Sequence, residues 1–162
     1  MRKVGLIMGS DSDFPIVEKA VNVLKELGIG YEVHVYSAHR TPEQVEEFTL
    51  KAQENGFGAI IAFAGMAAHL AGAIAARTVL PVIGVPCKSS ALDGMDALLS
   101  TVQMPTGIPV ATVAINGGAN AAILAAQILA VEDGALFEKL KSKRKHDAEI
   151  VLSKDAALLG KL

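Results

Sequence analysis

The sequence of 162 residues predicts a three-layer αβα sandwich built on a central parallel sheet. Short apolar runs, each the length of a buried strand, alternate with segments in which apolar residues recur every three to four positions. This alternation of strands and helices indicates βαβ units with right-handed crossovers, which place helices on both faces of a parallel sheet. The length suits one hydrophobic core, so we expect residues 1–162 to form a single domain.

The apolar runs define the expected strands. They cover residues 3–8, 31–36, 59–63, 81–85 and 109–115. In an open parallel sheet, ligands bind beyond the carboxyl ends of the strands, at the point where the strand order reverses. The loops after the first three strands are therefore the expected place for a functional site.

Helical spacing fills the segments between the strands. The first helix is expected to end at Gly28, which stands where a C-terminal cap belongs. Thr41, Pro42 and Gln44 predict a capping box at the start of the second helix. The order of elements favours the flavodoxin-like type of sandwich. Further helices are expected at residues 69–78, 93–101, 119–132 and 134–159, the last within a charged helical tail of about residues 133–162.

The composition excludes several classes of protein. The chain is 51% hydrophobic and 20% charged, with a net charge of −2, which rules out global disorder. Its charged fraction lies below the usual value of about 25%, which suggests contacts between subunits. The long uncharged stretch 97–131 is broken by proline, glycine and asparagine, so we expect no insertion into a membrane. Residues 1–5 lead into the first strand without the features of a signal peptide, which favours a cytoplasmic protein.

The single cysteine and two of the four histidines are expected to have no catalytic role. Cys87 has no cysteine partner for a disulfide or a zinc site, and we expect it to be a small packing residue. His34 lies within a predicted strand and is expected to be structural or exposed. His146 follows a basic cluster, but the chain lacks the overall basicity and the aromatic platforms of a nucleic-acid-binding protein.

The loop after the first strand, residues 9–13, combines two hydroxyl groups with the N-terminus of a helix. Ser10, Ser12 and the exposed backbone amides would suit an anion such as phosphate. Asp13 would repel phosphate and is better suited to accept hydrogen bonds from sugar hydroxyls. The alternative is that Ser12 or Asp13 merely caps the helix.

The next two loops each contribute a histidine. In the loop of residues 37–42, Arg40 has a planar fork suited to phosphate, and His39 can exchange protons near neutral pH. A plain surface loop is the alternative. In the loop of residues 64–70, small residues would let a ligand approach the backbone, and His69 either lines the pocket or lies buried at a helix start.

Six motifs resemble those of the PurE family, in the same order and at the family's spacing, from the first strand to about Glu132. The resemblance is to the bacterial mutase class. It implies a homo-octamer that interconverts N5-carboxyaminoimidazole ribonucleotide and 4-carboxy-5-aminoimidazole ribonucleotide in de novo purine synthesis, without a metal or organic cofactor. The motifs are Gly9-Ser10-Asp11-Ser12-Asp13, Ser37-Ala38-His39-Arg40-Thr41-Pro42, Ala67-Ala68-His69-Leu70, Gly84-Val85-Pro86, Val102-Gln103-Met104-Pro105 and the segment 120–129.

The resemblance also implies a mechanism, in which decarboxylation to bound CO2 is followed by recarboxylation at a ring carbon. It makes His39 the general acid–base and places the second catalytic histidine, His69, beside the base or the carboxylate. It implies that the phosphate is held by Ser10, Ser12, Ser37 and Arg40, the ribose by Asp13, and CO2 by the loop that contains Ala64 and Gly65.

Three residues depart from the family pattern. Phe63 and Met66 stand where glycines are usual, and Ala71 stands at a proline position. Phe63 and Met66 are expected beside the CO2 pocket, where their bulk would either narrow the pocket or shift the loop.

Two alternatives to a mutase remain at this point. One is an enzyme that carboxylates aminoimidazole ribonucleotide directly from CO2. The other is a non-enzymatic, flavodoxin-like nucleotide-binding module. Against the second, a phosphoreceiver needs an aspartate at the end of the third strand, where this chain has Phe63 and Ala64, and a flavin carrier needs more aromatic rings than five Phe and two Tyr.

Overall fold

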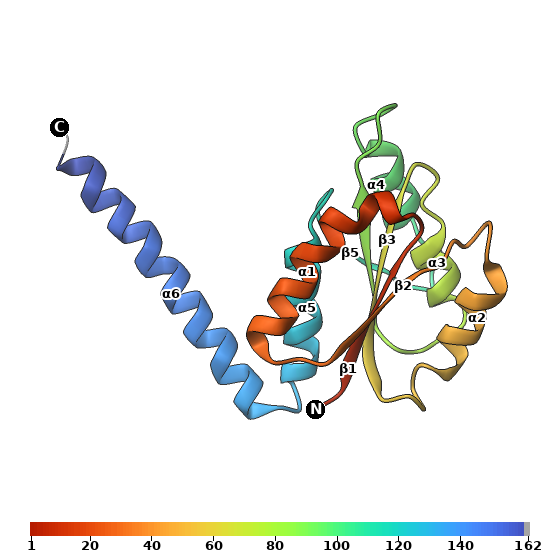
Figure 1. Cartoon of the computed structure of the whole chain (residues 1–162), viewed down its shortest axis with the longest axis horizontal. Coiled ribbons are helices and arrows are strands. Elements are labelled where there is room, and N and C mark those ends of the chain that lie inside the picture. Colours follow the sequence, from red (N-terminus) through yellow and green to blue (C-terminus); the bar gives the residue numbers. More distant parts are fainter. Residues whose placement is uncertain (161–162) are drawn as a thin grey trace.

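The apolar runs of the sequence form one parallel sheet with the strand order β2-β1-β3-β4-β5. The computed structural model describes residues 1–160, so the last two residues of the predicted tail 133–162 lie outside the described part. All neighbouring strands pair in parallel, which confirms the predicted class (Figure 1). The strands are β1 (Lys3–Met8), β2 (Tyr31–Val35), β3 (Phe57–Gly65), β4 (Val82–Cys87) and β5 (Ala111–Thr112).

The fifth strand is much shorter than predicted. Of the expected residues 109–115, only Ala111–Thr112 pair with β4, and Val113 adds one hydrogen bond from its N–H to the Gly84 carbonyl at 3.1 Å. Pro109 has no N–H to donate, and Asn116 turns the chain with a φ of 58°. A very short strand also leaves little unpaired edge at this side of the sheet.

The helices lie on both faces of the sheet. The helices α1 and α5 cover one face, and α2, α3 and α4 cover the other (Figure 1). Gly28 ends α1 with a φ of 74°, which confirms the predicted cap. The helices are η1 (Asp11–Asp13, a 3₁₀ turn), α1 (Phe14–Leu27), α2 (Pro42–Lys51), α3 (Leu70–Ala75), α4 (Met95–Val102), α5 (Gly118–Ala130) and α6 (Gly134–Leu159).

The capping box predicted at α2 is wrong, although the helix begins where it was expected. Thr41 is the N-cap residue and Pro42 opens the helix, but the Thr41 side chain makes no cap hydrogen bond. Instead, Thr41 Oγ1 accepts from the N–H of Ser37 at 2.8 Å and donates to the Ser37 carbonyl at 3.2 Å. The hydroxyl therefore closes the preceding turn and is not free to cap the helix.

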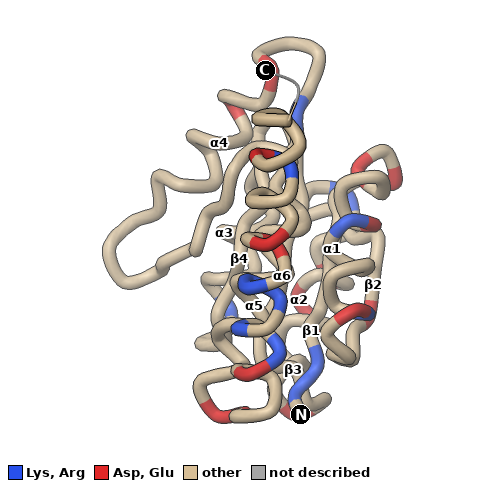
Figure 2. The backbone as a smooth tube through the Cα atoms, turned by 90° about the vertical axis from the view of Figure 1, so that its left-hand side faces the viewer, with Lys and Arg blue, Asp and Glu red and all other residues tan. Residues whose placement is uncertain are grey.

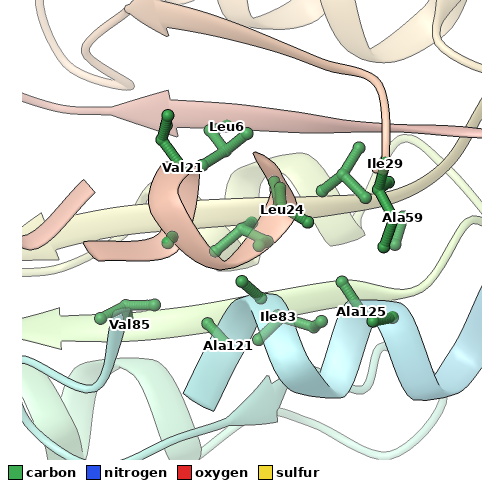
Figure 3. Close-up of a cluster of buried hydrophobic side chains, with 14 of the residues drawn as sticks. Leu6, Val21, Leu24, Ile29, Ala59, Ile83, Val85, Ala121 and Ala125 are labelled. Atoms are coloured by element: carbon green, nitrogen blue, oxygen red, sulfur yellow. The ribbon is translucent and has the colours of Figure 1, made fainter. Parts of the chain in front are cut away.

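Small residues bring the layers close together. The inward face of α5 includes four fully buried alanines that pack against α1 and the sheet, Ala121, Ala122, Ala125 and Ala126. Figure 3 labels two of them, Ala121 and Ala125. Beneath α4 on the other face, a Cβ atom at Gly84 would meet Thr101 Cγ2 at 2.3 Å. The richness in alanine and glycine thus sets a short distance between helices and sheet.

The long helix α6 extends away from the rest of the molecule (Figure 1). Within it, only Leu136 and Leu140, both in its first two turns, are buried. Asp133 caps the helix by accepting a hydrogen bond from the N–H of Leu136 at 3.0 Å. Blue and red segments alternate along α6 in Figure 2, and within residues 1–160 we find no helix with the length and apolarity needed to cross a membrane.

Replacing Gly84 by alanine should destabilise the fold, because the new Cβ atom would overlap the Thr101 methyl group. Overpacking of this kind costs roughly 1–3 kcal/mol, which urea unfolding followed by circular dichroism would measure. Gly134→Ala is the control, since no atom lies within 4 Å of the added carbon, and it should leave the midpoint unchanged or raise it. Thr101→Ser removes the clashing methyl group and should restore part of the stability of Gly84→Ala; no recovery would contradict the overlap.

Candidate active site

A cavity of about 640 Å³ lies at the carboxyl edge of the sheet, where the loops after β1, β2, β3 and β4 meet. The strand order reverses between β1 and β3, so this is the position expected for a ligand site. All nine residues that the sequence predicted for the site line this cavity: Ser10, Ser12, Asp13, Ser37, His39, Arg40, Ala64, Gly65 and His69.

Two larger cavities, of about 800 and 850 Å³, lie at the opposite end of the strands. The first is lined by residues such as Pro81 and Pro109, and the second by residues such as Met1 and Gly58. Neither is lined by a histidine, a cysteine or a lysine. Glu132 and Asp133 line the second of these cavities, but His39 and His69 both line the smaller cavity, and we place the site there.

The first loop is held by its own serines. Ser10 is the N-cap residue of η1, and its Oγ accepts from the N–H of Ser12 at 3.3 Å, while the two hydroxyl oxygens lie 2.9 Å apart. Asp13 precedes α1, but its side chain makes no cap hydrogen bond. The capping alternative considered for Ser12 and Asp13 is therefore wrong, because the Ser12 hydroxyl contacts Ser10 and the Asp13 side chain, which lines the cavity, does not cap α1.

Asp13 is half-buried beside the thiol of Cys87. Burial raises the pKa of the Asp13 carboxyl above its ordinary value, although a hydrogen bond from the Cys87 thiol partly offsets this. Burial, together with the nearby Asp13 carboxylate, raises the pKa of Cys87 far above the usual range for a thiol. Cys87 is fully buried, as predicted for a packing residue, and its thiol, which lies 3.6 Å from the Val85 carbonyl oxygen, stays neutral.

The second loop is tied to the first by Arg40. Its guanidinium Nη2 donates to the Gly9 carbonyl at 3.2 Å, and its backbone N–H donates to Ser37 Oγ at 3.2 Å. The Arg40 side chain is exposed at the cavity with donors to spare, because a guanidinium carries five N–H groups. Arg40 and the hydroxyls of Ser10, Ser12 and Ser37 thus present a cluster of donors suited to an oxyanion such as phosphate.

His39 and His69 are in direct contact across the cavity. Nε2 of His39 lies 2.8 Å from Nδ1 of His69, and the two rings are nearly perpendicular, with an angle of 87° between their planes. At this distance one nitrogen carries a proton and the other accepts it, so the two rings share a single hydrogen between these atoms. Both side chains are exposed, and the alternative of a buried His69 at the start of α3 is wrong.

The three departures from the family pattern have different outcomes. Met66 lines the cavity and is 61% exposed, with a φ of 53°. Phe63 was expected beside the CO2 pocket, but its side chain is fully buried in the cluster beneath α1 and α5, on the face of β3 opposite Ala64. Successive side chains of a strand point to opposite faces, and this parity sends Phe63 away from the site. Ala71 lies within α3, is buried in the hydrophobic cluster on that face of the sheet and does not line the cavity.

Other residues of the cavity carried weak signals in the sequence. Lys88 and Ser89 follow β4 and line the cavity from its far side, although only the first three loops had been singled out. His34 stacks on Tyr36 with ring centroids 4.8 Å apart, outside the cavity, which confirms a structural role. Among residues 1–160, no group of three or more His, Cys, Asp or Glu side chains is placed to hold a metal ion.

The fold and the cavity together define a flavodoxin-like α/β protein with a small-molecule site at the switch point of its sheet. The chain belongs to the AIR carboxylase family, whose model matches residues 3–149. The solved structure of Treponema denticola PurE superimposes with a TM-score of 0.87 at 31% identity, covering 96% of this chain and 97% of that one. The predicted resemblance to the PurE family is thereby confirmed.

Curated relatives carry two different names. A protein of Pyrococcus abyssi named N5-carboxyaminoimidazole ribonucleotide mutase is 57% identical over 89% of this chain and 83% of its own length. A protein of the same name from Thermotoga maritima is 52% identical over 95% of this chain and 90% of its own length. The phosphoribosylaminoimidazole carboxylase of Saccharomyces cerevisiae is 52% identical over 93% of this chain, which corresponds to 26% of that longer protein.

The raised pKa of Asp13 predicts that Asp13→Asn stabilises the protein in a pH-dependent way. In the unfolded chain the carboxyl titrates near its ordinary value of 3.8, whereas the folded protein keeps the proton to a higher pH. Ionisation of Asp13 therefore lowers the stability of the folded state; the loss is absent below the unfolded pKa and complete above the folded one. Because asparagine cannot ionise, the variant should be more stable than the wild type at neutral pH.

Urea midpoints measured across the acidic and neutral range would test this sign. The advantage of Asp13→Asn should shrink as the pH falls through the raised pKa toward the ordinary carboxyl value. A difference that stays constant with pH, or a variant less stable than the wild type at neutral pH, would contradict the assignment.

Proposed function

We propose that the protein is an N5-carboxyaminoimidazole ribonucleotide mutase of purine biosynthesis. The observation that carries the proposal is the contact of 2.8 Å between His39 Nε2 and His69 Nδ1, beside a cluster of phosphate donors in one cavity. Membership of the AIR carboxylase family and the names of the Pyrococcus and Thermotoga relatives support it. The reaction moves one carboxylate from N5 to C4 of the imidazole and one proton from C4 to N5.

The chemistry we propose needs one acid–base group that acts twice. In the first half, the bond between N5 and the carboxylate carbon breaks, CO2 departs without the bonding electrons, and His39 delivers a proton to N5. In the second half, C4 attacks CO2 with the electrons of the amino-substituted ring, and the proton displaced from C4 returns to His39. His69 shares a hydrogen with His39. It supplies a hydrogen bond to His39 when His39 has lost its proton and accepts one when His39 is protonated.

The remaining predicted residues bind the substrate in this proposal. Arg40, Ser10, Ser12 and Ser37 hold the phosphate, and the partly buried carboxyl of Asp13 accepts hydrogen bonds from the ribose. Ala64 and Gly65 form the wall that keeps CO2 beside the ring. A Cβ atom at Gly65 would lie 3.2 Å from the Cys87 carbonyl oxygen, so a larger residue there would press on the end of β4.

A direct carboxylase, which takes free CO2 onto aminoimidazole ribonucleotide, is the second candidate. The yeast relative, named phosphoribosylaminoimidazole carboxylase and 52% identical, favours it. The decisive experiment supplies the purified protein with the N5-carboxylated ribonucleotide alone, or with aminoimidazole ribonucleotide and bicarbonate. A mutase converts the first rapidly without bicarbonate, whereas a carboxylase requires the second mixture.

We also propose that residues 1–162 form one domain that assembles into a homo-octamer. The distal half of α6 carries a group of exposed apolar side chains with no partner among residues 1–160. Most of the stability of a helix in a protein comes from packing of its apolar side chains, so contact with other subunits would stabilise this part of α6. The side chains are Ile150, Val151, Leu152, Leu158 and Leu159. We place the enzyme in the cytoplasm, since a charged ribonucleotide does not cross a membrane unaided.

His39→Asn should abolish interconversion and leave nucleotide binding intact, because asparagine preserves polarity but cannot exchange a proton. The expected loss in kcat is at least 10²–10⁴-fold, the usual contribution of a general acid–base. A spectrophotometric assay would measure turnover, and calorimetry would measure binding. His146→Asn, the same change on the exposed surface of α6, is the matched control. Near-normal turnover of His39→Asn would refute the role.

Leu152→Glu should shift the assembly toward smaller species in sedimentation velocity. Leu152 is 67% exposed on α6, and a carboxylate there would be costly to bury against another subunit. Ser153→Glu adds the same charge one position along and is the control. Far-ultraviolet circular dichroism should be unchanged in both variants. An unaltered sedimentation coefficient for Leu152→Glu would argue against an α6 interface.

A further inference from the structure

The cavity contains a second cation that no motif assigned. Lys88 is the first residue after β4, and it lines the cavity together with its neighbour Ser89. Arg40, the other cationic residue of the lining, follows β2 on the opposite side. Strands β1 and β3 lie between β2 and β4 in the sheet. Neighbouring strands lie about 4.8 Å apart, so β2 and β4, which Arg40 and Lys88 follow, are separated by roughly 14 Å.

The backbone of Lys88 is fixed. Its N–H donates to Oδ1 of Asn116 at 2.8 Å, and the N–H of Asn116 donates in turn to the Pro86 carbonyl at 2.9 Å. The loop then turns back at Gly94, which has a φ of 92°. The Gly94 backbone packs closely against that of Lys88, because a Cβ atom at Gly94 would lie only 3.2 Å from the Lys88 Cα. The start of the Lys88 side chain is therefore held at one place on the rim of the cavity.

The ammonium group, in contrast, is held weakly. Nζ of Lys88 lies 3.0 Å from Oδ1 of Asp93, and the two side chains are 57% and 81% exposed. An exposed ion pair of this kind contributes only about 0–1 kcal/mol. The Lys88 ammonium can therefore leave Asp93 for a ligand carboxylate at little cost.

The ligand of the proposed function has two anionic groups. Its phosphate and its carboxylate are separated by the ribose and lie at opposite ends of the molecule. Arg40, next to the hydroxyls of Ser10, Ser12 and Ser37, accounts for the phosphate, and no cation of that cluster remains for the carboxylate. We propose that Lys88 binds the carboxylate of the carboxylated ribonucleotide, with the ammonium exchanging Asp93 for the ligand. This inference rests on the proposed function.

Lys88 thereby makes the protein distinguish the carboxylated ribonucleotides from aminoimidazole ribonucleotide. The decarboxylated compound retains the phosphate and lacks the group that Lys88 recognises. Loss of Lys88 must therefore weaken one class of ligand and spare the other, whereas loss of Arg40 must weaken both. A residue that merely supported the loop would affect both classes alike.

Calorimetric titration of the full-length protein with 4-carboxy-5-aminoimidazole ribonucleotide and with aminoimidazole ribonucleotide tests the inference. Lys88→Met should weaken binding of the carboxylated compound roughly fivefold, as expected for an ion pair of ~1 kcal/mol, and leave the other Kd unchanged. Arg40→Ala should weaken both. Lys141→Met, which removes an exposed lysine paired with Glu138 on α6, is the control and should change neither.

A second variant, Asp93→Asn, removes the carboxylate that competes with the ligand for the Lys88 ammonium. Asparagine tolerates the φ of 53° at this position, so the loop should keep its conformation. It should leave binding of the carboxylated ribonucleotide unchanged or tighter. Equal weakening of both ligands in Lys88→Met, no change in either, or weaker binding in Asp93→Asn would each overturn the role of Lys88. If the wild type bound neither ribonucleotide, the proposed function itself would fail, so the two failures are distinguishable.

Discussion

Parallel pairing of β1 with both β2 and β3 is the constraint on which the rest of the molecule depends. Because all five strands run in the same direction, their carboxyl ends share one edge of the sheet, and the loops after four of them meet at one cavity. The same pairing forces helices onto both faces and buries nearly all of the central strands, which requires the apolar and small residues that dominate the chain. The site is thus a consequence of how the sheet is connected.

The features predicted correctly from the sequence are those encoded by residues close together in the chain. The order of strands and helices, the αL cap at Gly28 and the placement of His39 and His69 after consecutive strands of the sequence follow from local pattern and from the geometry of parallel sheets. The errors have local causes as well. The hydroxyl of Thr41 bonds to the preceding turn, and the parity of β3 turns Phe63 into the core. Correct predictions would have required the side-chain dihedral angle of Thr41 and the face of β3 to which Phe63 points.

Other features of the site depend on contacts between distant segments, which a single sequence does not specify. The shared hydrogen of His39 and His69 joins residues 30 positions apart, and Asn116 fixes Lys88 from 28 positions away. Burial beside Asp13 raises the pKa of Cys87, although 74 positions separate the two residues in the chain. The close contact between Gly84 of β4 and Thr101 of α4 explains why the chain is rich in small residues. The helix could not lie this close to a sheet built of larger side chains.

The histidine pair has a thermodynamic consequence. Substrate and product of the proposed reaction are isomers, and the single hydrogen between the two imidazoles is returned at the end of every turnover in either direction. The protein therefore takes up no net proton and stores no free energy from one cycle to the next. Such a site is indifferent to direction, so the flow of carbon through it must be set by the enzymes that supply the one isomer and consume the other.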